Sequence, residues 1–107
     1  MEWLLFTRHK MPKYKEYYDL MMTKYKNEFD EFREIHDSYV LDPKGAQEEF
    51  NRVGRKIQDI IREYEDRLCG HSENGQYGKF SNTLADKLWD LLRKEFVKID
   101  YIGVISS

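Results

Sequence analysis

The feature that most constrains the fold is an uninterrupted helical spacing of apolar residues between Pro43 and Cys69. They follow one another at intervals of three and four: Ala46, Phe50, Val53, Ile57, Ile60, Tyr64 and Leu68. Such spacing places all of them on one face of an α-helix. Asp42 and Pro43 suit an N-cap and a first helical residue, and Gly70 suits the position just after a helix end. The sequence therefore predicts a long amphipathic helix over 43–69.

The residues that precede Asp42 show the same periodicity. From about residue 12 to residue 41, apolar side chains recur at intervals of three, four and, once, seven: Tyr14, Tyr18, Met21, Tyr25, Phe32, Ile35 and Tyr39. The long interval skips Glu28, which occupies a core position of the pattern, while Phe29 beside it supplies apolar bulk. We therefore predict a second long helix over about 12–41.

The short join at Asp42 predicts that the helices 12–41 and 43–69 lie antiparallel as a hairpin. In this register, large side chains face small or medium ones: Tyr39 faces Ala46, Phe32 faces Val53, and Tyr25 faces Ile60. Gly54 fits such packing, because a glycine inside a helix costs about 1 kcal/mol relative to alanine and needs a compensating reason. We expect an aromatic side chain of 12–41 to approach Gly54 closely.

A third, shorter helix is predicted over about 83–99, after a glycine-rich polar connection at 70–82. Thr83 and Asp86 match a capping box at its start. Its apolar positions continue at helical spacing: Leu84, Leu88, Leu91, Leu92, Phe96 and Ile99. The tail from residue 97 onward also alternates like a strand, and the first ten residues show no decisive period. Both termini are therefore open between a short strand and a helix.

Composition supports a single domain over residues 1–107. Hydrophobic residues make up 40% of the chain and aromatic residues 15%, which is too apolar for disorder and sufficient for one core. Together with the periodicity, this predicts an all-α, three-helix protein. It is built on a long antiparallel helical hairpin, with a shorter third helix and termini that are open to forming short strands.

Charge and cysteine content bear on partners and location. The 18 basic and 20 acidic residues leave a net charge of −2, which creates no overall field to attract nucleic acid or an anionic membrane. One cysteine excludes an internal disulfide and fits a reducing compartment. The apolar run "WLLF" at 3–6 is too short for a signal peptide or a membrane span. We expect a soluble, cytoplasmic protein with no membrane partner.

No group of residues in the sequence points to catalysis or to a cofactor. Cys69 and His71 could both bind zinc, but a structural zinc site needs four ligands and the second pair is missing. The carboxylates of Glu63 and Asp66 flank an apolar inward face and so do not share a metal cavity. A glycine-rich phosphate loop and a nucleophile elbow are also lacking. We expect no enzymatic activity, no metal and no cofactor.

A basic stripe on the helix 43–69 has two interpretations. Its members are Arg52, Arg55, Lys56 and Arg62. In the first interpretation they pair with the acidic half of the helix 12–41: Glu28, Glu31, Glu34 and Asp37. In the second they bind the phosphates of a nucleic acid. Tyr17 is the tyrosine of "KYKEYY" expected to face away from the core, and it could then stack on a base.

The predicted hairpin, about 42 Å long, exceeds what the third helix can cover. Apolar residues are therefore expected on the surface: Tyr17, Met22, Phe29 and the termini at 3–6 and 102–105. These exposed apolar residues predict that the protein is an interaction or regulatory module that binds a protein partner and forms a homodimer. Binding of a nucleic acid is the alternative function. The connection 70–82 is either a linker or a binding loop, and in the second case His71 and Tyr77 contribute to the site.

Overall fold

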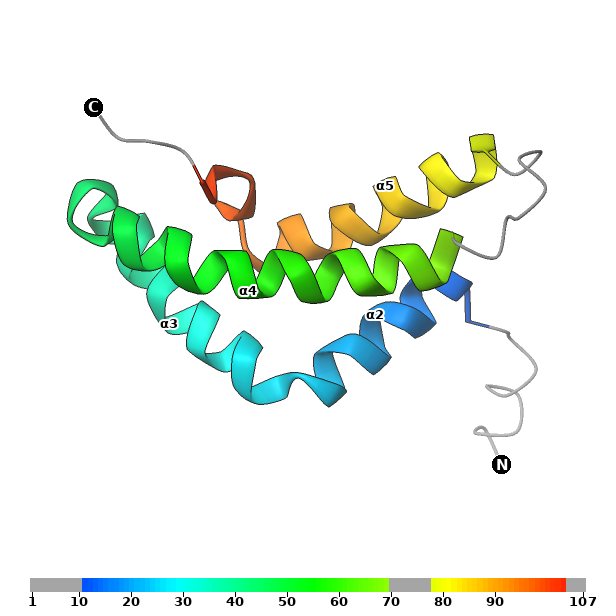
Figure 1. Ribbon diagram of the computed structural model, residues 1–107, viewed down its shortest axis with the longest axis horizontal. Helices are drawn as coiled ribbons and strands as arrows, with labels where there is room; N and C mark the ends of the chain where they lie inside the picture. Colours follow the sequence, from blue (N-terminus) through cyan, green and yellow to red (C-terminus); the bar gives the residue numbers. More distant parts are fainter. Residues whose placement is uncertain (1–10, 70–77, 104–107) are drawn as a thin grey trace.

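The computed structural model describes residues 11–69 and 78–103 of the chain, and this part is all-α, as predicted. It contains four α-helices where the sequence analysis expected three: α2 (Lys13–Lys24), α3 (Lys26–Leu41), α4 (Pro43–Cys69) and α5 (Gly78–Glu95) (Figure 1). A short 3-10 helix, η1 (Ile99–Tyr101), follows α5. No strand occurs in the described residues, and the terminal segments 1–10 and 104–107 lie outside them.

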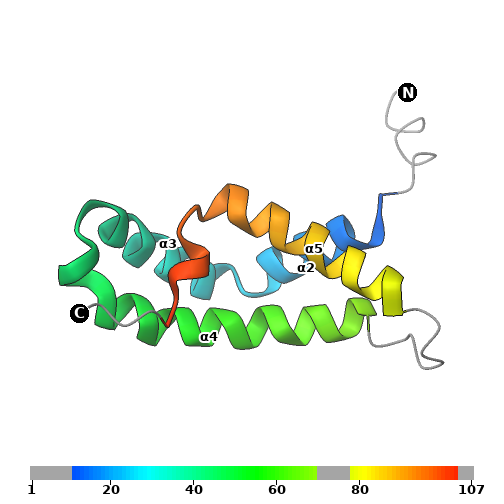
Figure 2. The same ribbon diagram turned by 90° about the horizontal axis from the view of Figure 1, so that it is seen from above.

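The long helix α4 is the centre of the fold and contacts α2, α3 and α5. In the view of Figure 1, α2 and α3 are drawn below α4 and α5 above it, and α5 runs antiparallel to α4 and also packs against α2. Figure 2 shows the same arrangement from above, with α4 along one side of the other helices. The bounds of α4 agree with the predicted helix 43–69, because Pro43 sets its start and the apolar face is continuous.

The core is formed by the facing sides of these helices. Its buried apolar residues are Met21, Phe29, Phe32, Tyr39, Phe50, Val53, Ile57, Ile61, Tyr64, Leu68, Leu88, Leu92, Phe96, Ile99 and Ile102. On α4 one expected position changes, since Ile61 is fully buried and Ile60 only partly so. None of the helices in the described part of the chain is long and apolar enough to span a membrane.

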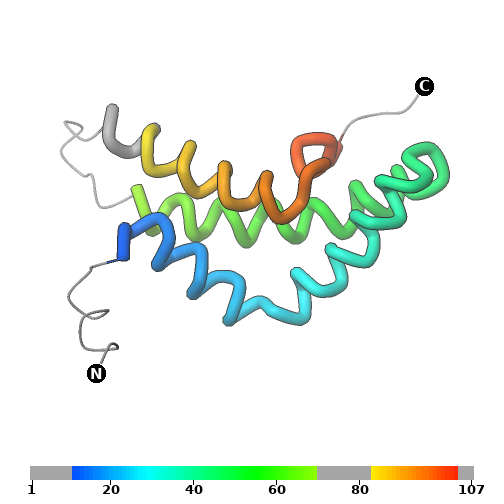
Figure 3. Tube along the Cα trace, turned by 180° about the vertical axis from the view of Figure 1, so that it is seen from behind, coloured from blue at the N-terminus to red at the C-terminus, as the bar shows by residue number. Residues whose placement is uncertain are grey.

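The predicted helix 12–41 is wrong in one respect, because it is broken at Tyr25. The backbone of Tyr25 has φ −109° and ψ 35°, and α2 and α3 meet there at an angle that Figure 3 shows from behind. An unbroken helix would carry Glu28 into the core, in line with Met21 and Phe32. The break instead leaves Glu28 exposed and buries Phe29, of which 2% remains exposed.

The aromatic contacts between the paired helices join residues other than the predicted pairs. The ring of Tyr39 stacks on Phe50, with centroids 4.1 Å apart. The ring of Tyr25 meets Tyr64 edge-on at 6.1 Å. Large rings therefore pack against large rings at these positions, in addition to any packing against the smaller side chains that the sequence predicted there.

The predicted bounds of the last helix, 83–99, also need correction. The helix α5 begins at Gly78, so Thr83 lies inside it rather than at a capping box, and the connection from α4 shortens to 70–77. It ends at Glu95, and the chain then turns into η1.

The close approach at Gly54 is confirmed, but its partner is different. A Cβ atom on Gly54 would lie 2.7 Å from the Cγ1 and Cγ2 atoms of Ile102. The neighbour is therefore an aliphatic side chain that follows η1, and not an aromatic side chain from the first half of the chain.

Candidate interaction surface

The segment Phe96–Gly103, which we call the C-terminal segment, is fixed to the helices at several points. Phe96 packs against Phe32, with ring centroids 4.9 Å apart. The main-chain N–H of Lys98 donates to Nε2 of His36 at 3.0 Å. The main-chain N–H of Gly103 donates to Oδ1 of Asn51 at 2.7 Å. The segment therefore has a defined position against α3 and α4, although it is not part of an α-helix.

His36 is a functional candidate that the sequence analysis missed. Only 4% of the residue is exposed, and its ring lies among the rings of Phe32, Phe50 and Phe96 at centroid distances of 5.6 to 6.2 Å. His36 lies four residues after Phe32 and three before Tyr39, and this spacing indicates that it shares their buried face of the helix. The apolar spacing instead predicts Ile35 on that face, and Ile35 is only partly buried.

Val97 and Tyr101 are exposed on the C-terminal segment, and Val40 is exposed near the end of α3, next to Tyr39; we call these three apolar side chains the α3–η1 surface. Their exposed fractions are 64%, 45% and 43%. Two contacts connect α3 to the C-terminal segment here. The rings of Tyr39 and Tyr101 have centroids 6.4 Å apart, and the main-chain N–H of Lys98 donates to His36. Exposed apolar side chains gathered on one part of a protein often mark an interface.

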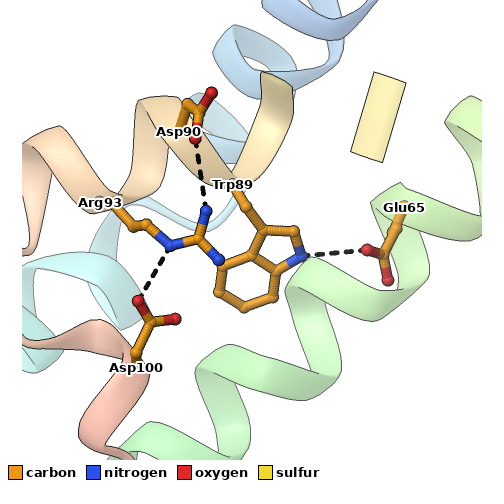
Figure 4. Close-up of polar contacts among 5 residues, drawn as sticks. All are labelled: Glu65, Trp89, Asp90, Arg93 and Asp100. Carbon is orange, nitrogen blue, oxygen red and sulfur yellow. Dashed lines mark hydrogen bonds and ion pairs between the residues drawn. The ribbon is translucent and has the colours of Figure 1, made fainter. Parts of the chain in front are cut away.

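A polar cluster joins α4, α5 and η1 (Figure 4). The indole Nε1–H of Trp89 donates to Oε2 of Glu65 at 3.0 Å. Arg93 donates to Asp100 at 2.9 Å and to Asp90 at 3.3 Å. The hydrogen bond with Asp100 is the main reason that the pKa of Arg93 is raised. Because these groups satisfy one another, the cluster holds η1 against α5 and is not a candidate ligand site.

The basic stripe does not pair with α3 as predicted. Arg52 makes a two-bond contact with Glu49 of its own helix, with both N–O distances at 2.7 Å. This contact lowers the pKa of Glu49 and raises that of Arg52. Arg62 likewise lies 3.6 Å from Asp59 on α4. The expected ion pairs across the hairpin are therefore wrong for Arg52 and Arg62.

Arg55 and Lys56 are the members of the stripe that remain exposed without an ion pair within 4 Å among the described residues. They are neighbours on the outer face of α4. Of the four basic residues of the stripe, only these two therefore remain available to bind an anionic partner.

The remaining predicted site residues have mixed outcomes. Tyr17 does not face away from the core, because it is half-buried and packs against the core cluster. Met22 is also half-buried against the core, and Phe29 is buried, so the expected exposure of these two residues is wrong as well. His71 and Tyr77 lie outside the described residues.

Metal ligands were not expected, and in the part of the chain that the structure describes no group of three or more His, Cys, Asp or Glu side chains could hold a metal ion. Cys69 is half-buried at the end of α4 and packs against the core.

The comparisons with known proteins add no functional information. No family model matches the chain, and no curated protein or solved structure matches it.

Proposed function

We propose that the protein is an interaction or regulatory module without catalytic activity of its own, and that it binds a protein partner through the α3–η1 surface. The observation that carries the proposal is the exposure of Val97 and Tyr101 on a segment that is otherwise anchored to the core. Covering such side chains is favourable by about 25 cal/mol per Å² of apolar surface. Their fixed position also lowers the ordering cost that a partner must overcome.

We further propose that the first partner is a second copy of the chain. A twofold axis brings the same surface of two copies together, so that one apolar patch covers another. A cytoplasmic location is part of the proposal and is supported by the single cysteine, Cys69.

Nucleic-acid binding is the alternative, and one observation favours it. Arg55 and Lys56 are adjacent, exposed and without an ion pair among the described residues, so they are available to phosphates. Against it, Arg52 and Arg62 are occupied by carboxylates of the same helix, which lowers the positive potential along the stripe.

Light scattering after size exclusion tests the homodimer. We expect wild type at micromolar concentration to have twice the chain mass of 13.0 kDa. Val97→Glu should give the monomer mass, because it places a charge within the apolar contact. Leu20→Glu is the matched control, since Leu20 is 54% exposed on α2 and the chemical change is similar. It should leave the dimer intact.

Two results would contradict this proposal. A wild-type monomer across the concentration range would exclude self-association. Equal dissociation of the Val97 and Leu20 variants would show that the interface is not the α3–η1 surface. For a partner other than the chain itself, capture of a specific protein from native lysate should be lost with Val97→Glu and kept with Leu20→Glu.

A further inference from the structure

The hydrogen bonds of His36 define its protonation state. A main-chain N–H is always a donor, so the bond from Lys98 at 3.0 Å requires Nε2 of His36 to be an unprotonated acceptor. The ring proton of the neutral imidazole then sits on Nδ1, which lies 3.2 Å from Oδ1 of Asp37 and donates to it. The C-terminal segment is therefore docked on a neutral histidine.

Protonation of this ring is incompatible with the docked segment. An N–H on Nε2 would point at the N–H of Lys98, so that two donors would face each other and the bond would be lost. The ring is enclosed by Phe32, Phe50 and Phe96, which offer no acceptor to the new N–H. The Nδ1–H of the imidazolium keeps its bond to Asp37, but the buried Nε2–H is left without an acceptor, which is costly, and water becomes accessible to it if the segment leaves.

The charged groups around the ring fall into two sets. On α3, the carboxylate of Asp37 favours the imidazolium, and it stays beside the ring whether or not the segment is docked, because it is the next residue. Its side chain is also 70% exposed, so water weakens its effect. The guanidinium of Arg33, with Cζ 4.7 Å from the centroid of the Phe96 ring, opposes a second positive charge nearby.

The other elements packed against the ring add little charge. Glu95 of α5 is held by Arg33 at 3.4 Å. On the C-terminal segment, the ammonium of Lys98 lies over the ring of Tyr101 and Asp100 is held by Arg93. The helix α4 faces the histidine with the ring of Phe50. None of these groups replaces the hydrogen bond that protonation removes.

We propose that His36 is a pH-sensitive latch: the C-terminal segment docks on α3 and α4 while His36 is neutral and is released when His36 takes up a proton. The docked state binds fewer protons than the released state, so docking is favoured at higher pH and is lost as pH falls.

The latch stands on the docking contacts alone and does not depend on what the α3–η1 surface binds. If the proposed function also holds, release of the segment removes Val97 and Tyr101 from that surface, and acidification switches binding off.

Amide hydrogen exchange and NMR titration of the full chain, between about pH 7.5 and 5.5, test the latch. The protection factors of Lys98, Ile102 and Gly103 should fall together, by up to about tenfold per pH unit, the limit for uptake of one proton. The fall should follow the protonation shift of the His36 ring, while amides in the middle of α4 remain protected. Protonation of His36 with the three amides still protected would overturn the proposal.

Variants make the test specific. His36→Gln keeps an acceptor in a similar position but does not titrate, so the pH response should disappear. His9→Gln and His71→Gln replace the other two histidines of the chain and should leave the response unchanged.

A second variant keeps the proposal testable if His36→Gln does not fold. Ile102→Ala weakens docking over Gly54 without touching the histidine. Because the docked state is less stable in this variant, a smaller degree of protonation is enough to release the segment. The midpoint of release should therefore move to higher pH. An unchanged midpoint in this variant would show that the histidine does not control the segment.

Discussion

At the residue scale, Ile102 fills the space that a side chain at Gly54 would need. A Cβ there would lie 2.7 Å from two atoms of Ile102. Gly54→Ala improves helix propensity by about 1 kcal/mol, whereas overpacking of a filled site costs about 1–3 kcal/mol. We expect the variant to lower the free energy of unfolding by about 1 kcal/mol, because the overpacking outweighs the propensity. Urea denaturation measures it.

The same substitution should change sign when Ile102 is shortened. In an Ile102→Ala background the new methyl group meets open space, so Gly54→Ala should raise the free energy of unfolding by up to about 1 kcal/mol. The two backgrounds form a double-mutant cycle that isolates the contact. Stabilisation in the wild-type background as well would show that Ile102 moves aside at no cost.

Tyr18 is a residue whose ionisation links stability to alkaline pH. Burial raises its pKa above the ordinary value of about 10, and the charge of Glu95 adds to this, with Arg33 opposing. The folded state therefore keeps the phenol proton after the unfolded state has lost it. Stability from this group is complete below about pH 10 and falls as the pH rises further.

Tyr18→Phe removes the titrating hydroxyl and should remove this part of the alkaline loss. Urea denaturation of both proteins at about pH 8 and pH 10.5 checks it. Wild type should lose more stability between the two pH values than the variant. An equal loss in both proteins would contradict the assignment to Tyr18.

At the scale of elements, the break at Tyr25 decides which of two adjacent residues is in the core. Phe29 is buried and Glu28 is exposed. Phe29→Ala should therefore lower the free energy of unfolding by about 3–5 kcal/mol. Glu28→Ala should change it by no more than about 0.5 kcal/mol, as expected for an exposed site. Thermal or urea unfolding measures both, and a large effect of Glu28→Ala would favour a continuous helix.

Helix α4 could be predicted from the sequence at both ends because its signals are local. Pro43 fixes the start and the apolar spacing runs without interruption to Cys69. The break at Tyr25 has no proline or glycine to mark it, and it follows from tertiary packing, which selects Phe29 over Glu28. The apolar periodicity indicates that Glu28 does not fit the pattern. It does not indicate whether the helix continues with Glu28 in the core or breaks so that Phe29 is buried.

The candidate surface was less predictable than the helices for the same reason. The end of α5 and the path of the C-terminal segment depend on Lys98 meeting His36 and on Ile102 meeting Gly54. These contacts join residues that are far apart in sequence. The sequence identified Gly54 as a close-packing site, yet it contained no local signal for the identity of the neighbour. His36 was visible only as a polar residue on an otherwise apolar helix face.

At the scale of the whole molecule, most ion pairs among the described residues lie within single helices and few connect helices. Lys15–Asp19, Lys26–Asp30, Arg52–Glu49 and Arg67–Glu63 are of the first kind, and Arg33–Glu95 joins α3 to α5. Exposed pairs contribute about 0–1 kcal/mol each. The arrangement of the helices therefore depends on the apolar core. Charged residues on the surface can be substituted without unfolding the protein.

This freedom allows a direct test of the nucleic-acid alternative by charge reversal. Arg55→Glu with Lys56→Glu should alter the free energy of unfolding by no more than about 0.5 kcal/mol per site, because neither cation has an ion pair among the described residues. The earlier expectation of pairing with the acidic end of α3 implied a clear loss of stability.

Oligonucleotide binding then separates the two functions. For a protein-interaction module, we expect wild type to bind single- or double-stranded oligonucleotides weakly or not at all at physiological salt, and the double variant to keep the dimer mass. Lys13→Glu with Lys94→Glu is the matched control, since both lysines are exposed, lie on α2 and α5, and their reversal changes the net charge by the same amount. The alternative function predicts affinity that falls steeply with salt and is lost in the α4 variant but kept in the control, because phosphate contacts release counterions. That pattern, measured by fluorescence anisotropy, would replace the α3–η1 surface with the outer face of α4 as the functional site.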